Sequence, residues 1–523
     1  MNFVRVLFNK IGTVPVTRPI IQKLRDAYPE MVAYGVEENL FEPETVFDHV
    51  LTSHDDALFG SYSKIDLNSL SLDPHVYEEI RQFEGELLRM ADRVQYHDQE
   101  KYIATHKGVA KYQGTFDDRS QLVLRHLLFW SKMFEEHKFD AIVAQNYGHV
   151  VFDSIIYRLA ESRRIPFIFF NETRPFFRSL YMYESLETFG DLSLGRTLIA
   201  ATSEKLIPNS EDRLENMLSS VGQIDQVAQP NGEEIELRKS KYDSSLRSAL
   251  ITSGSEGGET SLLKFAAWTA IFQKFKRLFF SPIRTLKQVG RTAVRMRDTR
   301  RSMKDELGSV TNGELPENFV FFPLQSQPNA TTVVKGGIFV EQREAIALIA
   351  NNLPVGWKVV VKESPRQWRR LYPRRPKYWT HISLIPNCHV VSHEIESEDL
   401  IKKAIALIEI SYSSLILKAL QIRKPAIVLG RTHLSGLDGV LPVESAEDLR
   451  NAFRDIKEGQ LRGSSSLVEF VTDTYSATLE GALSYAPQAK DPNDREIEAN
   501  RTVHNVATVL EEWLRRRVIK IDG

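Results

Sequence analysis

The sequence predicts an α/β protein with two doubly wound, parallel-sheet domains that face a cleft, a helical middle segment and a C-terminal helix. Three observations lead to this fold class. Short apolar runs alternate with longer amphipathic patterns in each half of the chain, which implies parallel strands joined by right-handed crossovers. A polar stretch containing TSGSEGGETS separates the two halves. The last stretch, DREIEANRTVHNVATVLEEWLRRRV, has the spacing of one long amphipathic helix.

The first half contains a complete strand–helix–strand unit. The chain opens with the strand-like run FVRVLF, and a largely helical region follows from about 73 to 137. We then expect a strand over 141–144, an amphipathic helix over 151–163 and a second strand over 166–170.

The second half alternates more cleanly. Its expected strands are FVFFPL, WKVVVK, HVVSH, IALIEI and PAIVLG, and its expected helices are VEQREAIALIANNL, SEDLIKKA and SSLILKALQI. A length of 523 residues allows two to four domains. We expect an N-terminal α/β domain (1–202), a linker with a basic amphipathic helical segment (203–317), a C-terminal α/β domain (318–460) and a helical tail (461–523).

The composition excludes several kinds of function. The chain is 42% hydrophobic and 26% charged, as in an ordinary globular protein, and its net charge of −2 gives no support for a nucleic-acid partner. Cys388 is the only cysteine, which excludes an internal disulfide framework and a multi-cysteine metal site. The thirteen histidines lack metal-ligand spacing, so we expect no metal and no cofactor.

The N-terminus, MNFVRVLFNKIGTVPVTRP, has neither the continuous apolar region nor the cleavage site of a signal peptide. No run approaches the roughly 18 apolar residues of a membrane-spanning helix. We therefore expect a cytoplasmic protein.

Polar residues follow three expected strands of the second half. After FVFFPL come Gln325, Gln327 and Asn329, whose amides can hydrogen-bond sugar hydroxyls or the edge of a nucleobase. Open α/β sheets bind ligands where their strands end, so this loop is a candidate site. The alternative is a polar loop that caps the next helix.

The second strand end carries charge. Lys362, Glu363, Ser364 and Arg366 follow WKVVV around Pro365, and the cations suit a diphosphate or a carboxylate. We expect the later arginine pairs, 369–370 and 374–375, to form a solvated face.

The third strand end reads Ser411, Tyr412, Ser413 and Ser414, at the turn into a helix. Free amide groups at a helix start, together with serine hydroxyls, can bind an anion. The alternative is that one serine serves as a simple N-cap, which would leave the rest of the cluster unexplained. Together, the three strand ends favour binding of a nucleotide phosphate and sugar, and the chain has no P-loop or dinucleotide motif.

A family resemblance supports this hypothesis. The order of FFPLQSQPNATT, VVVKESP and SEDLIKKAIALIEISYSSLILKALQIRKPAIVLG resembles the nucleotide-sugar half of GT-B glycosyltransferases of the bacterial capsule polysaccharide biosynthesis type, which include the Kdo transferases. The resemblance covers about 318–448 and, more loosely, 140–175. It implies a GT-B-like fold and transfer of a sugar from a nucleotide-activated donor, bound by 318–460, to a surface polysaccharide or glycolipid acceptor beside 1–202. The donor site would comprise Gln325, Gln327, Asn329, Lys362, Glu363, Ser364, Arg366, Ser411, Tyr412, Ser413 and Ser414.

The chain departs from the family pattern at three positions. Ser364 replaces the histidine of the usual Glu-His-Pro, which contacts the donor phosphate in the family, and Asn329 replaces the aspartate of the Kdo transferases' Gln-x-x-x-Asp. Lys418 replaces the glutamate of the usual Glu-Ala-Leu. The donor therefore stays open among CMP-, CDP- and UDP-linked compounds.

Two alternative functions follow. The SYSS turn also resembles the glycerophosphotransferases that build teichoic acids, which allows a glycerophosphotransferase-like polymerase. The three departures allow a catalytically degenerate GT-B scaffold that binds glycan.

An inverting transfer needs a base on the acceptor side, and two strand ends of the first half offer one. We rank Glu172 first, His149 second and Asp153 third. Glu172 follows a strand directly, although it could instead pair with Arg174 or cap the next element. A retaining mechanism would need no such base.

The segment 262–304 carries twelve Lys or Arg residues and one Asp. Aromatic residues at 265, 268, 272, 275 and 279 share one helical face. A cationic face beside an aromatic one suits a peripheral helix at the inner face of the cytoplasmic membrane. The alternative is that the aromatic residues pack between the two domains.

Overall fold

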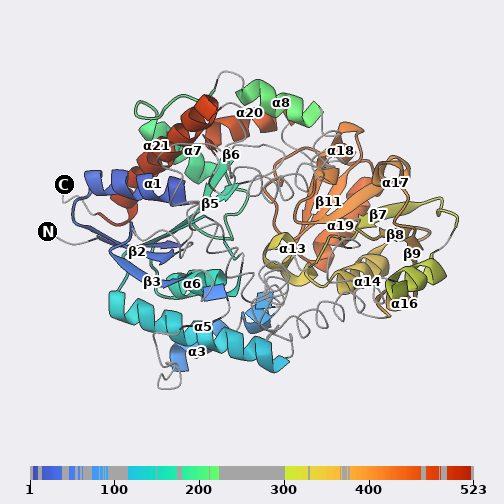
Figure 1. Cartoon of the computed structure of the whole chain (residues 1–523). Coiled ribbons are helices and arrows are strands. Elements are labelled where there is room, and N and C mark those ends of the chain that lie inside the picture. Colours follow the sequence, from blue (N-terminus) through green and yellow to red (C-terminus); the bar gives the residue numbers. More distant parts are fainter. Residues whose placement is uncertain are drawn as a thin grey trace, which may run out of the picture.

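In the computed structural model, the chain folds into two α/β lobes, each built around its own sheet (Figure 1). The predicted fold class, two α/β units with parallel sheets, is confirmed. The structure describes residues 4–9, 14–37, 46–53, 57–58, 60, 62, 74–81, 83–85, 87–88, 90–91, 116–145, 147–148, 150–172, 179–210, 213–222, 301–311, 313–327, 330–364, 367, 374, 377–460, 467–481, 483 and 492–519.

The first lobe is built on a sheet with the strand order β13-β6-β5-β4-β1-β2-β3. Its strands are β1 (Val4–Asn9), β2 (Met31–Glu37), β3 (His49–Ser53), β4 (Ala141–Ala144), β5 (Phe167–Glu172), β6 (Ser179–Tyr183) and β13 (Leu479–Glu480). β1 to β5 pair in parallel, whereas β6 pairs antiparallel with β5 and β13. The wholly parallel sheet expected for this half is therefore corrected at one edge. Only residues 173–178 separate β5 from β6, too few for the dozen or more that a parallel crossover needs.

Helices cover both faces of this sheet. α1 (Val14–Ala27), α7 (Ser193–Thr202) and α21 (Pro492–Arg517) share one apolar cluster with it. α5 (Phe116–His137) and α6 (Val151–Ser162) form the cluster on the opposite face, and α3 (Pro74–Arg81) packs against α6. Because both faces are buried, strands such as AIVA are apolar throughout rather than alternating.

The second lobe has a sheet of the order β12-β11-β10-β7-β8-β9, with every neighbouring pair parallel. Its strands are β7 (Phe319–Pro323), β8 (Lys358–Lys362), β9 (Cys388–Val391), β10 (Ala406–Ile410), β11 (Ala426–Leu429) and β12 (Val440–Val443). The sequence predicts the first five to within two residues at each end.

Helices also cover both faces of the second sheet. The short α13 (Ala330–Lys335) and the 3-10 turn η2 (Gly337–Phe339) follow β7. α14 (Gln342–Asn352), α16 (Tyr378–Ser383) and α19 (Ala446–Lys457) pack on one face, and α17 (Ser397–Lys403) and α18 (Ser414–Gln421) pack on the other.

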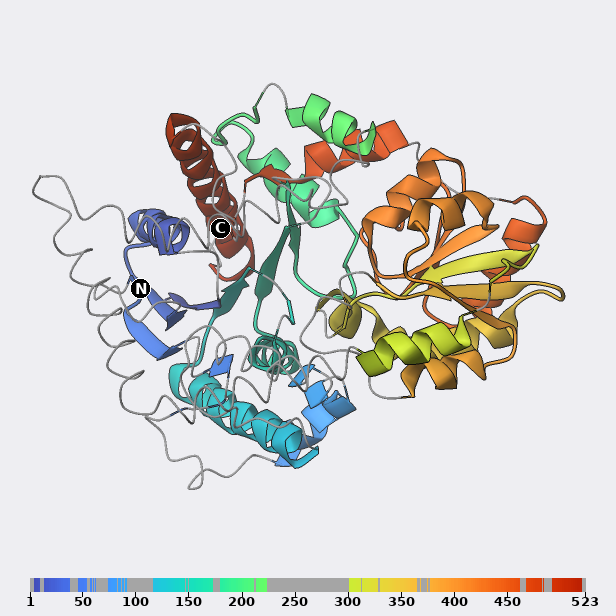
Figure 2. The same cartoon turned by 45° about the vertical axis from the view of Figure 1, so that its right-hand side comes forward.

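The C-terminal part of the chain returns to the first lobe. α8 (Arg213–Gly222) and α20 (Leu467–Ala477) pack on each other, and their Met217 and Phe470 join an apolar cluster of the second lobe. Beyond them, β13 extends the first sheet, and α21 lies against α1 (Figure 2). The predicted tail is therefore an integral layer of the first lobe.

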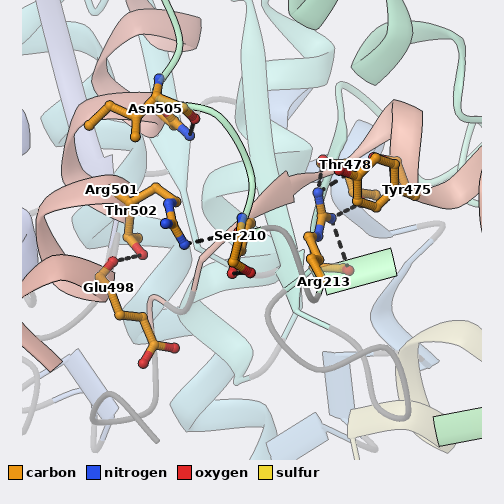
Figure 3. Close-up of polar contacts among 11 residues, drawn as sticks. Ser210, Arg213, Tyr475, Thr478, Glu498, Arg501, Thr502 and Asn505 are labelled. Carbon is orange, nitrogen blue, oxygen red and sulfur yellow. Dashed lines mark hydrogen bonds and ion pairs between the residues drawn. The ribbon is translucent and has the colours of Figure 1, made fainter. Parts of the chain in front are cut away.

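A buried polar network holds this return in place (Figure 3). Arg213 Nη2 donates to Thr478 Oγ1 at 2.7 Å and to Ser179 Oγ at 3.2 Å, and its Nη1 donates to the Thr478 carbonyl oxygen at 3.1 Å. The guanidinium thus connects α8, the end of α20 and strand β6. Burial lowers the pKa of Arg213 to about 10, so it stays charged at neutral pH.

Glu480 of β13 forms a second connection. Its carboxylate accepts hydrogen bonds from Ser210 N at 2.6 Å and Ser210 Oγ at 2.7 Å, and it pairs with Arg501 Nη1 at 3.1 Å. The segment before α8 is thereby joined to helix α21.

The predicted basic segment falls almost wholly outside the described residues, which include only its last positions, 301–304. There the chain is helical over 301–310, and Met303 and Leu307 enter an apolar cluster of the second lobe. Within the described chain, none of the helices has the length and apolar character that crossing a membrane requires.

We predict that Arg213→Leu lowers the free energy of unfolding by about 2–4 kcal/mol, because it leaves buried oxygen atoms without their donor. Arg196→Leu is the matched control: it breaks a pair with Asp473 between α7 and α20 that is exposed on both sides. Such exposed pairs contribute about 0–1 kcal/mol. Urea denaturation of the two variants measures the difference, and equal losses would contradict the role given to Arg213.

Candidate functional site

Four neighbouring strands of the second sheet, β8, β7, β10 and β11, end at one edge of the lobe. All four are parallel, so the polar residues that follow them are brought to the same edge. The structure therefore places the three strand ends singled out in the sequence side by side, in the spatial order β8, β7, β10.

A buried carboxyl group joins two of these strand ends. Glu409, the second-last residue of β10, accepts hydrogen bonds from Gln325 Nε2 at 3.1 Å and from Ser413 Oγ at 2.6 Å. Gln325 Nε2 also donates to the Ile410 carbonyl oxygen at 2.6 Å. Burial raises the pKa of Glu409 to about 7, although the two hydrogen bonds act to lower it. The end of β7 and the start of α18 are thus held by one side chain of β10.

Ser413 is the N-cap of α18. Its Oγ accepts from Leu415 N at 3.1 Å while its own proton goes to Glu409. This is the N-cap role considered for one serine of the turn. Ser411 has a left-handed backbone with φ of 61°, and its buried Oγ has no hydrogen-bond partner. Tyr412 and Ser414 are half-buried beside it.

The end of β8 is held by a buried ion pair. Arg374 Nε donates to Glu363 Oε2 at 3.0 Å, and its Nη2 donates to Glu363 Oε1 at 3.1 Å and to the Gln325 carbonyl oxygen at 2.9 Å. Burial alone would lower the pKa of Arg374, but Glu363 raises it above its ordinary value. The expectation that 374–375 form a solvated face is wrong for Arg374, because its side chain neutralises a buried carboxylate.

Gln327 completes this inner layer. Its side chain donates to the Val340 carbonyl oxygen at 2.7 Å and accepts from Arg374 Nη1 at 3.2 Å, and its backbone N donates to Gln367 Oε1 at 2.8 Å. Gln325, Gln327 and Glu363 therefore bond to the protein itself and fix the shape of the strand ends.

Lys362 offers a cation at the same edge. Its ammonium donates to Ser397 Oγ, at the start of α17, at 2.9 Å. Burial lowers the pKa of Lys362, and the nearby Glu396 acts in the opposite direction. Ser364 is half-buried two residues farther on. Asn329 and Arg366 lie outside the described residues.

The family's usual glutamate position on α18 carries Lys418, which is buried and pairs with Glu398 of α17. The charge at this position is therefore opposite to the family pattern and is bound to a neighbouring helix.

The edge of the second sheet meets strand ends of the first lobe. Gly190, after β6, has a φ of 102°, and a Cβ built there would lie 2.5 Å from the Thr432 carbonyl oxygen. Only glycine combines that backbone with so close an approach. Beside it, the His433 ring lies 5.6 Å from the Tyr181 ring and 4.7 Å from the Tyr412 ring, measured between centroids.

Lys335, the last residue of α13, reaches across the same junction. Its Nζ lies 3.5 Å from Asn171 Oδ1, at the end of β5, and 4.2 Å from the centroid of the Phe189 ring. Asn171 and Tyr181 are register partners in β5 and β6, so they share one face of the first sheet. Near the strand ends, these two residues of that face contact the second lobe.

The candidate bases have different surroundings. Glu172 is half-buried at the end of β5, and the strand alternation directs it to the face opposite Asn171. Asp153 is buried in the first turn of α6 and accepts from Val150 N at 3.2 Å and Asn9 Nδ2 at 3.3 Å, as a capping residue does. His149 lies outside the described residues. In the part of the chain that the structure describes, no group of three or more His, Cys, Asp or Glu side chains is arranged to hold a metal ion.

Sequence reasoning missed four residues of this region: Glu409, Arg374, Lys335 and His433. A signal existed for Glu409, because a carboxylate interrupts the otherwise apolar strand IALIEI near its carboxyl end. Lys335 directly precedes the pair Gly336 and Gly337, where the chain turns sharply. For Arg374 and His433 the sequence alone offers no such mark.

Comparison with known proteins gives similarity at the level of structure only. No family model matches the chain. No curated protein matches it in sequence.

The similar solved structures include a beta Kdo 2,7 transferase, KpsC, of Thermosulfurimonas dismutans, with 10% identity over 73% of this chain and 89% of that one and a TM-score of 0.29. They also include a UDP-GlcNAc 2-epimerase of Methanocaldococcus jannaschii in complex with UDP-GlcNAc and UDP, with 12% identity over 90% and 97% of the two chains and a TM-score of 0.22. A third is the glycosyltransferase SsfS6 of Streptomyces sp. SF2575 with thymidine diphosphate, with 10% identity over 97% and 99% and a TM-score of 0.20. At these identities and TM-scores, none of them identifies a reaction or a substrate for this chain.

We predict a pH-dependent stability difference between the wild type and Glu409→Gln. The folded state holds the Glu409 proton more tightly than the unfolded chain, since its pKa is raised from 4.5 to about 7. The wild type therefore loses stability as the pH rises from about 4.5 to about 7, by roughly 3 kcal/mol in all. The variant lacks this loss. Its free energy of unfolding therefore rises relative to that of the wild type between about pH 4.5 and about pH 7, and the difference between the two proteins is constant above that range.

Urea denaturation at pH 5 and pH 8 measures this change. Glu344→Gln on α14, whose side chain is exposed, is the control and should show the same difference from the wild type at both pH values. A Glu409→Gln difference that does not change with pH would contradict the prediction.

Proposed function

We propose that this protein is a glycosyltransferase of the capsule polysaccharide biosynthesis type, which moves a sugar from a nucleotide-activated donor to a surface polysaccharide or glycolipid. The observation that carries the proposal is the alignment of three polar strand ends, those of β8, β7 and β10, at one edge of a parallel sheet opposite strand ends of another lobe. Ligands of open α/β sheets bind at such an edge.

The donor phosphates are the best match for Lys362 and the start of α18. An ammonium that is partly desolvated interacts more strongly with an anion than an exposed one does. The first turn of α18 adds backbone amides, and Ser411 adds a buried hydroxyl without a partner. The proposed phosphate and sugar contacts also include Ser364, Ser414, Asn329 and Arg366.

Four other residues of the proposed donor site bond to the protein itself: Gln325, Gln327, Glu363 and Ser413. Their side chains bond mainly to one another's loops and to Glu409 or Arg374, so we assign them the task of holding the site's shape. Tyr412 offers a ring beside the site for a sugar or a base. Residues whose geometry is fixed by such a supporting layer bind a ligand without reorganising first.

Glu172 remains the first choice for the acceptor base, with His149 second, although strand alternation directs the Glu172 side chain to the face of β5 opposite Asn171. Asp153 is the weakest of the three proposals, because its carboxylate already caps α6. The acceptor would be a glycan or a lipid-linked glycan beside the first lobe. Contact of 262–304 with the inner face of the cytoplasmic membrane is part of the same proposal.

Two other functions stay open. The SYSS turn supports a glycerophosphotransferase-like polymerase that uses a CDP-linked donor. The pairing of Lys418 with Glu398, where the family has a glutamate, supports a degenerate scaffold that binds glycan without transferring sugar.

We predict that one nucleotide of the set CMP, CDP, UDP and GDP, or its sugar conjugate, raises the melting temperature of the purified protein. A ligand that binds only the folded state stabilises it, increasingly as its concentration exceeds the dissociation constant. Lys362→Met should weaken that affinity by about tenfold or more, through loss of a charge-assisted contact. Lys403→Met, an exposed cation of α17, is the control and should bind as the wild type does.

The identity of the nucleotide separates the functions. CMP favours a Kdo-like donor, CDP a glycerophosphate donor, and UDP or GDP a hexose donor. No response to any of them would remove the proposal of a nucleotide-dependent transferase and favour the scaffold.

We predict that Glu172→Gln lowers the rate of transfer by about 10²–10⁴-fold while nucleotide affinity is retained, as expected for loss of a general base. The measurement is product formation followed by mass spectrometry, with the donor found above. Glu187→Gln, an exposed carboxylate of the same lobe, is the control. Full activity of Glu172→Gln would exclude Glu172 as the base and leave His149 or a retaining mechanism.

A further inference from the structure

Lys335 carries a desolvated charge at the junction of the two lobes. Its backbone carbonyl oxygen accepts from Arg431 N at 2.8 Å, so its main chain is held on the loop after β11. Its side chain then extends over Phe189 and toward Asn171 of the first lobe. The ammonium therefore belongs to the second lobe and ends among side chains of the first.

No carboxylate of the described residues pairs with this ammonium. Its polar contact there is the amide oxygen of Asn171 at 3.5 Å, which is long for a hydrogen bond. The undescribed stretches that adjoin β5 and α13 in sequence, 173–178 and 328–329, contain no Asp or Glu. Burial without a nearby opposite charge lowers the pKa of Lys335 to about 8. An ammonium in this situation is destabilising unless an anion accompanies it.

The neighbouring polar groups also lack partners. Asn171 is buried, and its Nδ2 has no hydrogen-bond acceptor. His433 is 2% exposed, and neither of its ring nitrogens has a partner. Burial, and secondarily the charge of Lys335, lowers the pKa of His433 to about 3, so its ring is neutral and carries one N–H donor. Buried polar atoms without partners are rare in folded proteins, and several at one junction require an explanation.

We propose that Lys335, Asn171 and His433 form a binding site for an oxyanion, a phosphate or a carboxylate, at the junction of the two lobes. We call these three residues the junction site. All three can donate a hydrogen bond, and an oxyanion supplies the acceptors and the negative charge that the junction lacks. That the oxyanion belongs to a donor or acceptor substrate rests on the proposed function, but the binding itself does not.

The site draws its groups from both lobes, so a bound oxyanion would contact β5 of the first lobe together with α13 and the loop after β11 of the second. A ligand that contacts both lobes favours the arrangement in which they are together. The junction site would therefore couple oxyanion binding to the relative position of the lobes.

The direct test is the melting temperature with inorganic phosphate, pyrophosphate, acetate or glucuronate, for the wild type and three variants. Lys335→Met keeps an apolar stem over Phe189 and removes the charge. Asn171→Asp places a carboxylate beside the ammonium. Lys424→Met is the matched control, since its half-buried ammonium donates to the Ala404 carbonyl oxygen at 2.7 Å, close to the start of β11 and so at the opposite edge of the sheet.

We expect at least one of the anions to stabilise the wild type and the Lys424→Met variant alike. Lys335→Met should weaken the affinity for that anion by tenfold or more and, without anions, should melt no lower than the wild type. Asn171→Asp should melt higher than the wild type without anions, because it supplies the missing counter-ion, and should lose the response to anions.

The opposite results overturn the proposal. The proposal is wrong if none of the four anions stabilises the wild type, or if Lys335→Met responds to the anions as strongly as the wild type does. It is also wrong if Asn171→Asp, without anions, melts at a lower temperature than the wild type. A response to phosphate or pyrophosphate alone assigns the site to a phosphate-bearing substrate, and a response to acetate or glucuronate alone assigns it to an acidic sugar.

The two proposals fail separately. Nucleotide binding that depends on Lys362 but not on Lys335 would leave the proposed function standing without the junction site. Anion binding through Lys335 without any response to nucleotides would leave the junction site standing without a nucleotide-dependent transferase.

Discussion

The hydrogen bonds that Gln325 and Ser413 donate to the buried carboxyl group of Glu409 are the interaction on which the candidate site depends. They join the end of β7, the end of β10 and the first turn of α18, which are parts of the second lobe that we propose as the nucleotide site. A buried carboxyl group is tolerated only with such partners or with a proton, and here it has both available at neutral pH. The neighbouring pair of Glu363 and Arg374 does the same for the end of β8. Two buried carboxyl groups thus stabilise the carboxyl edge of this sheet: Glu409 through hydrogen bonds from neutral side chains, and Glu363 through an ion pair.

The junction between the lobes follows a different physical rule. Within the second lobe, buried charges such as Glu363 have partners, whereas at the junction Lys335 faces the first lobe without an opposite charge among the described residues. The paired groups hold the shape of the strand ends in the second lobe. The unpaired ammonium of Lys335 is the group that we propose to bind an anion. The return of α21 and β13 to the first lobe, held by Arg213 and Glu480, fixes how the chain crosses between the lobes.

Much of the fold could be predicted from the sequence, because parallel strands buried on both faces are continuous apolar runs. The strands β7, β8 and β10 are examples, and the helices between them have clear amphipathic spacing. The strands β2, β3, β6, β12 and β13 were not predicted. SLYMY follows a short loop with no helix, and the two-residue β13 pairs with it from almost 300 residues away. Local pattern carries no information about such a pairing.

The candidate site was predictable only in part, for the same reason. Residues at or shortly after the end of an apolar strand, such as Lys362 and Ser413, can be recognised in the sequence. Arg374 is eleven positions from Glu363 in a run of basic residues, and its burial depends on a tertiary contact. His433 acquires its surroundings from Tyr181 of the other lobe. Its charge alone predicted that Arg374 would be exposed, but Arg374 is buried because it pairs with the buried carboxylate of Glu363.

The central claim is that a nucleotide-bearing ligand binds at the carboxyl edge of the second sheet and faces the first lobe. A crystal structure of the protein with the nucleotide that stabilises it most tests this claim directly. We predict density for the nucleotide over the ends of β7, β8 and β10, with phosphate oxygens near Lys362 or the first turn of α18. Density for the nucleotide elsewhere, with this edge occupied only by solvent, would contradict it.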